Sequence, residues 1–190
     1  MPHRKPVLDA LKVYLQKFPE EKAVILQMRH FIEATADCFC RSHIAGHMTG
    51  SSWLLNPQKD KVLLTHHKKL GKWLQCGGHA DGDDNIWQVA LKEAVEESGI
   101  TDISFLSMEI FDIDIHEIPA YKTVPAHLHY DVRFLMQAPT ENFIISSESN
   151  DLKWFDKATL HQLIAEGKLS PSLKRMVLKE ELFNSRHLAK

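Results

Sequence analysis

The sequence lacks any long apolar run, and this absence sets the first limit on its class. No uninterrupted apolar stretch approaches the roughly 18 residues of a transmembrane helix, so we expect no membrane span. Residues 1–6 are basic, but no apolar core of signal-peptide length follows them, so we expect no export. Cysteine is also scarce. Three cysteines cannot all pair, which favours a reducing cytoplasm.

An excess of charge of one sign is also missing. Lys and Arg total 23 against 25 Asp and Glu, and the net charge of −2 excludes a strongly basic nucleic-acid binder and a dominant acidic tail. The length of 190 residues predicts one domain of ordinary size, or one domain with appended helices. A chain of this length buries roughly 70% of its unfolded surface, so it needs no disulfide or metal staple to fold. The twelve histidines stand out, but composition alone assigns them no role.

Two kinds of hydrophobic pattern divide the chain. Residues 6–36 have the period of two helices, and Pro19 suits the first turn of the second. Beyond residue 41, alternation predicts strands at 47–56, 61–68, 73–78, 104–118, 126–136 and 152–155. Further helices are predicted at 85–98, 157–166 and 171–183. This order indicates an α/β or α+β domain with a mixed β-sheet.

The predicted helix at 85–98 carries acidic side chains on its apolar side. At about 100° per residue, an apolar sector is formed by Ile86, Val89, Ala90, Leu91 and Ala94. Glu93 and Glu97 fall inside that sector, and Glu96 lies beside them. Carboxylates this close raise one another's pKa, and a hard divalent cation such as Mg²⁺ or Mn²⁺ resolves the conflict. The alternative is an acidic patch on the surface.

The residues around this helix match a known motif. Gly78, five residues, Asp84, seven residues and then Lys-Glu-Ala-Val-Glu-Glu-Ser-Gly-Ile at 92–100 resemble the Nudix box. The family pattern is Gly, five residues, Glu, seven residues, Arg-Glu, an aliphatic residue, any residue, Glu-Glu, any residue, Gly and an aliphatic residue. The match holds at Gly78, Glu93, Glu96, Glu97, Gly99 and Ile100. Two positions depart from it: Asp84 replaces a Glu, and Lys92 replaces an Arg.

The resemblance implies a fold and a division of the chain. The fold is a Nudix-like α/β/α sandwich with a mixed β-sheet, plus N-terminal and C-terminal helices. Residues 41–190 form the Nudix hydrolase domain with its closing helices, and residues 1–40 form an N-terminal helical extension.

The resemblance also implies a metal site. Mg²⁺ or Mn²⁺ is held by three carboxylates and the carbonyl of Gly78, the carboxylates being those of Glu93, Glu96 and Glu97. Glu96 or Glu97 is the candidate general base. The family's Arg supports the acids through a fork of hydrogen bonds, whereas Lys92 offers a point charge. Asp84 either faces the metal site or caps the helix.

The implied reaction is hydrolysis of a nucleoside diphosphate linked to another group X. Splitting a pyrophosphate builds negative charge that divalent cations neutralise, and a nearby carboxylate takes the proton of the attacking water. Two alternatives stay open: an isomerase acting on a prenyl diphosphate, and a non-catalytic Nudix-like nucleotide-binding module. Nothing in the sequence specifies X. The N-terminal helices could cover the substrate groove or form a homodimer interface.

Two predicted strands gather polar side chains on one face. Along 126–136 the polar positions are His127, His129, Asp131 and Arg133, and the preceding strand adds Asp112, Asp114 and His116. This face is solvated, or it lines a substrate groove in which His127, His129 and Arg133 meet phosphate or base. In that groove Asp131 orients a histidine. A third interpretation is a transition-metal site formed by His127, His129 and Asp131. His79, which follows the Gly77-Gly78 pair, is a further candidate substrate contact, as is His116.

Cys38, Cys40, His43 and His47 supply four possible nitrogen and sulfur ligands within ten residues. Their spacing is not that of the usual zinc finger, so ordinary buried cysteines are favoured over a structural zinc site.

Overall fold

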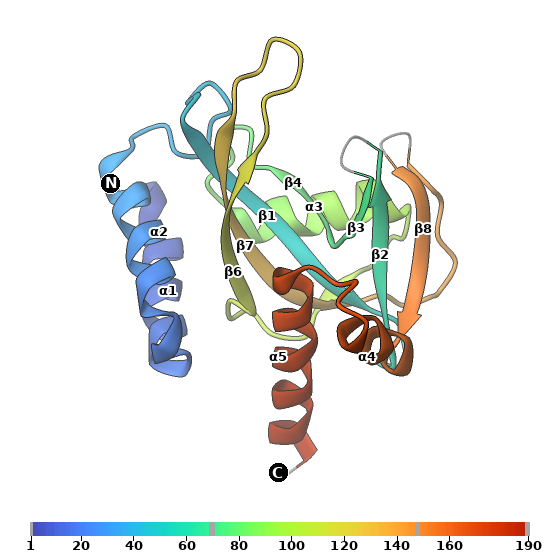
Figure 1. Cartoon of the computed structure of the whole chain (residues 1–190). Helices are drawn as coiled ribbons and strands as arrows, with labels where there is room; N and C mark the ends of the chain where they lie inside the picture. The colour runs from blue at the N-terminus through green and yellow to red at the C-terminus, as the bar shows by residue number, and fades with distance from the viewer. Residues whose placement is uncertain (1, 69–70, 147–148, 189–190) are drawn as a thin grey trace. The chain divides into compact units, whose positions relative to one another are not determined.

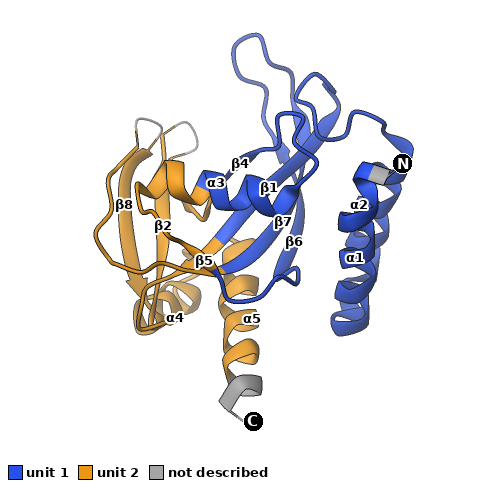
Figure 2. Ribbon diagram, turned by 180° about the vertical axis from the view of Figure 1, so that it is seen from behind, with its two compact units in different colours: residues 1–52, 77–93, 105–135 blue, residues 53–76, 94–104, 136–190 orange. Residues whose placement is uncertain are grey.

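The computed structural model of this chain describes residues 2–68, 71–146 and 149–188 (Figure 1). Contacts divide the chain into two compact units (Figure 2). Unit 1 comprises Met1–Ser52, Gly77–Glu93 and Phe105–Leu135, and unit 2 comprises Trp53–Cys76, Ala94–Ser104 and Met136–Lys190. Within the described residues, no helix combines the length and the apolarity that a membrane crossing demands.

Unit 1 begins with the two predicted helices. They are α1 (Lys5–Lys17) and α2 (Lys22–Ala34), joined through the 3₁₀ turn η2 (Pro19–Glu21). Arg4, which is only 3% exposed, donates from its guanidinium to the carbonyls of Ile32 at 2.7 Å and Thr35 at 2.8 Å. A cation at these carbonyls satisfies the unpaired acceptors at the end of α2 and favours its dipole.

The helices of unit 1 rest on strands through aromatic contacts. Phe31 of α2 stacks on Tyr130 of β7 (His127–Gln137), with ring centroids 3.7 Å apart and planes 3° apart. Strand β6 (Asp112–Ile118) pairs antiparallel with β7, from Asp112 opposite Arg133 to Ile118 opposite His127. The polar residues predicted to share one face of these strands therefore do so.

Strand β1 (Gly46–Leu55) pairs with both β7 and β4 (Cys76–His79). Within unit 1, Leu128 donates its backbone N–H to Ala45 at 3.1 Å, and Ala80 donates to Met48 at 3.3 Å. The two contacts bracket His47 on β1, so its neighbours come from both β7 and the end of β4.

The predicted acidic helix is α3 (Ile86–Ser98), and it ends before Gly99, whose φ of +67° suits glycine. Its first turns lie close to β1. A Cβ at Gly50 would stand 2.9 Å from the carbonyl oxygen of Ile86 and 3.0 Å from the nitrogen of Ala90. The absence of a side chain at Gly50 thus lets the helix backbone approach the strand.

Unit 2 is built on the strand β2 (Lys61–His67), which pairs antiparallel with β3 (Lys72–Leu74) and β8 (Ser149–Asp156). Two helices follow: α4 (Lys157–Ala165) and α5 (Pro171–Leu188). Asp156 caps α4 by accepting from the Thr159 N–H at 2.7 Å, and Ser170 caps α5 by accepting from the Leu173 N–H at 3.2 Å.

Two predicted strands are wrong in their extent. The segment predicted at 73–78 is two strands, because β3 pairs with β2 whereas β4 pairs with β1. The segment predicted at 104–118 is divided into β5 (Ser104–Phe105) and β6. A turn separates them: the Ser107 hydroxyl accepts from the Glu109 N–H at 3.1 Å, and the indole of Trp87 donates to the Met108 carbonyl at 2.8 Å. These contacts replace ladder hydrogen bonds.

Candidate active site and histidine cluster

The backbone of Gly78 lies against the carboxylate of Glu93. A Cβ built on Gly78 would overlap both the Oε2 and the Cδ atoms of Glu93. The two residues are fifteen positions apart in the sequence, yet the peptide of β4 and the acid of α3 meet in unit 1. A side chain at 78 would therefore displace the Glu93 carboxylate from this position, and glycine leaves the backbone beside a carboxylate, both of which carry oxygen ligands.

The other acids of α3 differ in exposure as the helical projection predicts. Glu97 is 9% exposed, whereas Glu96, beside the apolar sector, is exposed. Glu93, Glu96 and Glu97 belong to one continuous helix and are spaced at i, i+3 and i+4, the spacing at which helical side chains are neighbours. Lys92 is exposed.

Asn85, rather than Asp84, caps α3. The Asn85 side chain accepts from the Gln88 N–H at 3.3 Å, and Asp83 accepts from the Asn85 N–H at 2.9 Å. Asp84 is exposed in the loop ahead of the helix. Of its two predicted roles, capping is thus taken by its neighbours.

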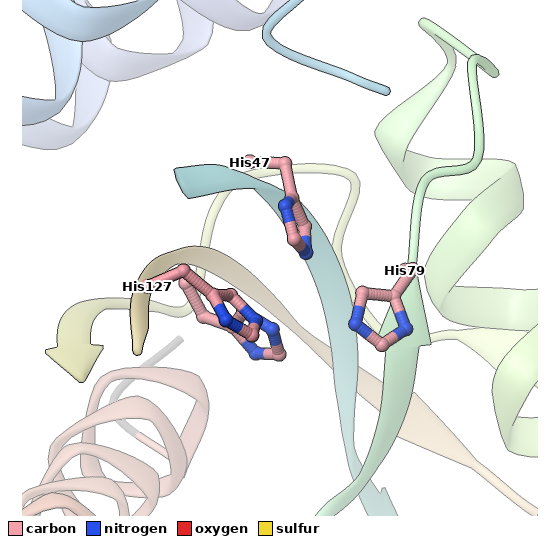
Figure 3. A group of neighbouring side chains, drawn as sticks. His47, His79 and His127 are labelled. Carbon is pink, nitrogen blue, oxygen red and sulfur yellow. The ribbon is translucent and has the colours of Figure 1, made fainter. Parts of the chain in front are cut away.

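Four histidines of unit 1 converge. One ring nitrogen from each of His47, His79, His127 and His129 can be chosen so that all four lie within 4.8 Å of one another. Figure 3 shows the rings of His47, His79 and His127 directed toward a common space from β1, β4 and β7. The centroids of adjacent rings are 4.9 to 5.2 Å apart, as for His79 with His129 and for His127 with His129. In the described part of the chain this is the one group of His, Cys, Asp and Glu residues that meets such a criterion.

Burial dominates the electrostatics of the cluster. It lowers the pKa of His79 to about 4 and that of His129 to about 2, and it also lowers the pKa of His47. Neighbouring positive charge acts in the same direction, with Arg41 the second cause at His79. His47, His79 and His129 are therefore held at neutral pH in the neutral form of imidazole, which is the form that binds metals.

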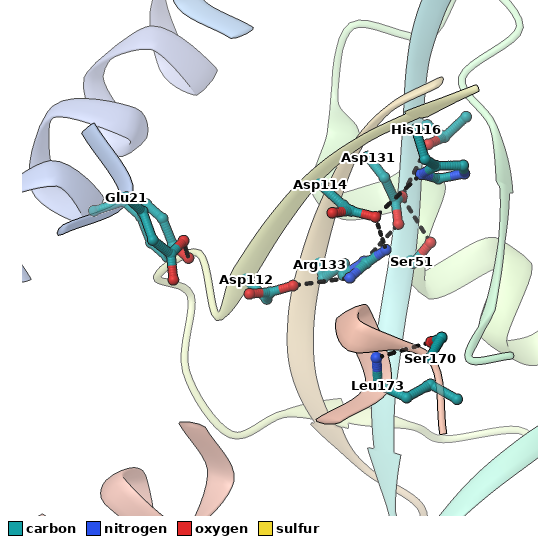
Figure 4. Close-up of polar contacts among 11 residues, drawn as sticks. Glu21, Ser51, Asp112, Asp114, His116, Asp131, Arg133, Ser170 and Leu173 are labelled. Atoms are coloured by element: carbon teal, nitrogen blue, oxygen red, sulfur yellow. Dashed lines mark hydrogen bonds and ion pairs between the residues drawn. The ribbon is translucent and has the colours of Figure 1, made fainter. Parts of the chain in front are cut away.

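Asp131 and Arg133 lie on β7 beyond the histidines and are buried in a charge network (Figure 4). The Arg133 guanidinium donates to Asp131 at 2.7 Å, to Asp112 at 2.8 Å and to Asp114 at 3.2 Å. Asp131 also accepts from the hydroxyls of Thr49 at 2.9 Å and Ser51 at 2.7 Å. The polar face of these strands is consequently internal at this point, and it is not solvated.

Burial is the largest single influence on Asp131 and opposes its ionisation, but the charge and hydrogen bond of Arg133 together with His116 and the Ser51 hydroxyl lower its pKa. The pKa of Arg133 is raised by Asp131, Asp112 and Asp114 against the same opposing burial. His116 joins the edge of this network, with its Nδ1 3.3 Å from Asp114 and its ring centroid 5.5 Å from that of His129. The structure thus links the predicted polar residues into one chain that ends at the histidine cluster.

Among the described residues, Cys38, Cys40 and His43 do not join His47 in a metal-ligand group, in line with the favoured interpretation of ordinary cysteines. Cys38 is fully buried, and desolvation raises the pKa of its thiol to about 11. The Nδ1 atom of His43 lies 2.7 Å from the Gly46 carbonyl. All three cysteines are free. His47 joins the other histidines instead, which sequence spacing does not indicate because the partners are 32 to 82 residues away.

The family was tested by comparison with known proteins. The model of the NUDIX domain matches residues 45–177. This match spans more than half of the chain, so the protein belongs to the Nudix family, as the box predicts. The match supports the predicted class of pyrophosphohydrolase. No curated protein matches the chain significantly.

Solved structures show the same fold. A Nudix-family hydrolase from Clostridium perfringens is 21% identical, with a TM-score of 0.55 over 72% of this chain and 97% of that one. An Ap4A hydrolase from C. elegans is 15% identical, with a TM-score of 0.52 over 73% and 97% of the two chains. The MutT protein from Methanosarcina mazei is 15% identical, with a TM-score of 0.55 over 75% and 97%. The chain therefore has the α/β/α Nudix fold with a mixed β-sheet and flanking helices.

Proposed function

We propose that the protein is a Mg²⁺- or Mn²⁺-dependent hydrolase that splits the pyrophosphate bond of a nucleoside diphosphate linked to a group X. The observation that carries the proposal is the contact between the Gly78 peptide and the Glu93 carboxylate. It sets the first and central elements of the box side by side in a chain of the Nudix family.

The donors of the box suit a hard cation. Glu93, Glu96 and Glu97 offer carboxylate oxygens and Gly78 offers a carbonyl oxygen, and oxygen donors are those that Mg²⁺ and Mn²⁺ prefer. These four residues would hold the ion. When bound, the ion would neutralise the negative charge that develops on the phosphate oxygens.

The protein residues supply the proton transfer and the positioning. Glu96 or Glu97 takes the proton of the attacking water, and Glu97 is the acid of the two that is shielded from solvent. Lys92 places a positive charge on the same helix, and Asp84 adds negative charge in the preceding loop. The carboxylate of Glu93 lies against the backbone of Gly78.

The remaining predicted contacts serve two roles. His116 is a candidate substrate contact at the edge of the charge network. Asp131 and Arg133 are nearly inaccessible, so we assign them to support of β6 and β7 rather than to direct contact with substrate. Residues 41–190 remain our proposed catalytic domain, with residues 1–40 as an extension that can cover the substrate or form a homodimer. The three free cysteines support a reducing compartment such as the cytoplasm.

The test is release of phosphate or nucleotide with Mg²⁺ from a panel that separates the candidate functions. The panel comprises nucleoside triphosphates, nucleotide sugars, ADP-ribose, dinucleoside polyphosphates and prenyl diphosphates. We expect turnover that falls by at least about 100-fold in Glu97→Gln, which is about 2.7 kcal/mol of transition-state stabilisation. Glu20→Gln, which changes an exposed glutamate outside the box, is the matched control.

Isomerisation of a prenyl diphosphate without phosphate release would support the isomerase instead. Nucleotide binding without turnover, unchanged in Glu97→Gln, would support the binding module. Either result would overturn the proposed hydrolase.

A further inference from the structure

We propose that His47, His79, His127 and His129 form a second, separate metal site that binds one divalent transition-metal ion, with Zn²⁺ the best fit. The site does not depend on the proposed hydrolase activity. Its four ligands are nitrogens, which suit Zn²⁺, Cu²⁺, Ni²⁺ and Fe²⁺, whereas the oxygen donors of the box suit Mg²⁺ and Mn²⁺.

The distances permit tetrahedral coordination. Zn–N bonds of about 2.0–2.1 Å place the ligand atoms of a tetrahedron about 3.4 Å apart. The four nitrogens lie within 4.8 Å of one another, so each must move by at most about 0.9 Å toward the centre. Rotation of the imidazole rings about their side-chain bonds achieves this shift without a change in strand pairing.

One ring is already fixed in the tautomer that a metal needs. The Nδ1 atom of His127 lies 2.9 Å from the carbonyl oxygen of Pro125. A carbonyl only accepts, so Nδ1 carries the proton and Nε2 keeps its lone pair for a ligand bond. A backbone carbonyl in this position is the usual outer partner of a metal-bound histidine.

Two other rings have buried nitrogens without partners. His47 is 4% exposed, and within the described residues neither Nδ1 nor Nε2 of its ring has a hydrogen-bond partner. The buried Nε2 atom of His129 also has no hydrogen-bond partner among the described residues. Buried polar atoms of this kind cost free energy, and a ligand that binds them removes the cost. A bound metal ion satisfies one ring nitrogen of His47 and the Nε2 atom of His129 together.

The charges around the cluster favour a cation. Four neutral imidazoles leave the +2 charge of the ion uncompensated. Beyond His129, three carboxylates share the single guanidinium of Arg133, and these four groups sum to −2 when ionised. His116 connects the two regions through Asp114 and His129. The negative charge of this network therefore compensates the charge of a cation bound at the neighbouring histidines.

Four protein ligands describe a closed site, which is the structural rather than the catalytic type. The ligands come from β1, β4 and β7, so a bound ion ties these strands together. His79 directly follows Gly78, which contacts Glu93. The ion thus also fixes the strand end that carries the glycine of the Nudix box.

Metal binding is measured directly on the full chain, stripped with chelator and reloaded with Zn²⁺ in the presence of excess Mg²⁺. We expect about one Zn²⁺ per chain by mass spectrometry. His47→Gln and His127→Gln should each weaken Zn²⁺ binding by at least about 100-fold, since removing a ligand costs more than removing an outer partner. His161→Gln, which alters an exposed histidine of α4, is the matched control and should bind as wild type does.

Substitution with Co²⁺ reports the geometry. Four-coordinate Co²⁺ with nitrogen ligands absorbs strongly in the visible range, whereas six-coordinate Co²⁺ on oxygen ligands absorbs weakly. We expect the strong bands in wild type and in the triple variant Glu93→Gln, Glu96→Gln, Glu97→Gln, and their loss in His127→Gln. Circular dichroism identifies variants that fail to fold. If His47→Gln fails to fold, His127→Gln alone tests the loss of a ligand.

Absence of stoichiometric Zn²⁺ from wild type would overturn the proposal. So would Zn²⁺ and strong Co²⁺ bands that survive in the histidine variants but disappear in the triple glutamate variant. That second pattern would assign the metal to the box. Failure of turnover on every substrate, with Zn²⁺ binding intact, would overturn the proposed hydrolase and leave the histidine site standing.

Discussion

Gly78 and Glu93 are so close that a side chain at position 78 would collide with the carboxylate of Glu93. We expect Gly78→Ala to displace Glu93 and to lower kcat by at least about 100-fold. The backbone of Gly78 has no positive φ, so alanine itself introduces no strain there.

The measurement is steady-state kinetics on the best substrate of the panel, with far-UV circular dichroism as the check on folding. Gly167→Ala is the comparison, because its new Cβ would meet no atom within 4 Å and its positive φ affects only the folding stability, which the circular dichroism monitors. Full activity in Gly78→Ala would show that the contact does not position Glu93.

Replacing the central cation of the charge network should destabilise unit 1. Arg133→Met leaves the buried carboxylates of Asp112 and Asp131 and the partly buried one of Asp114 without their shared partner, and breaking a buried pair costs about 3–5 kcal/mol. Urea unfolding measures the change in the free energy of unfolding. Arg29→Met, which removes a more exposed pair with Glu33, should cost less than about 1 kcal/mol. Equal effects in the two variants would contradict the assigned role of Arg133.

The metal-free protein should lose stability as the pH falls below about 6.5, the ordinary pKa of histidine. The folded-state pKa values of His79 and His129 are depressed, so the unfolded chain binds more protons and unfolding becomes easier in acid. At pH 5.5 each ring contributes a loss of about 1.4 kcal/mol. The titratable and charged groups that shift these two rings are His47, His116, His127, Arg41, Asp81 and Asp131.

Urea unfolding in chelator at pH 7.5 and pH 5.5 tests this expectation. The loss should shrink in His79→Gln, which removes one of the two rings. The lowered pKa of Asp131 acts in the same direction, but its effect appears only near and below pH 3.8, outside this window. Unchanged stability across the window would mean that the histidines are hydrated in the folded protein.

Lys92→Arg should raise kcat by about fivefold, or about 1 kcal/mol of transition-state stabilisation. Arginine offers a planar fork of donors to the acids of α3, whereas the lysine ammonium offers a single charge. Lys12→Arg, at an exposed position of α1, is the control and should leave kcat unchanged. A rise in KM with no rise in kcat would assign position 92 to substrate binding instead.

The box and its helix could be predicted because their signals are local. The spacing of Glu93, Glu96 and Glu97 is a property of one helix, and Gly99 marks its end within the same segment. His127 and His129 could also be placed on a shared face, because alternation along one strand fixes it.

His47 could not be assigned from the sequence, because its neighbours depend on pairing between distant strands. Local spacing groups it with Cys38, Cys40 and His43, whereas backbone bonds of Ala45 to Leu128 and of Met48 to Ala80 bring it to β7 and β4. For the same reason, the sequence indicates Arg133 and Asp131 as residues of an accessible groove, whereas the structure buries both. Alternation shows which residues share a face, but it does not show what covers that face.

The guanidinium of Arg4 closes the end of α2 from a position before α1 begins. The fourth residue of the chain is therefore part of the folded core of unit 1. A shortened protein starting at Lys5 would expose the last carbonyls of α2 to water. The end of α2 would then fray toward Phe31 and weaken the stack of Phe31 on Tyr130. A protein shortened for crystallisation, or one released from a cleavable tag, should for this reason retain Arg4.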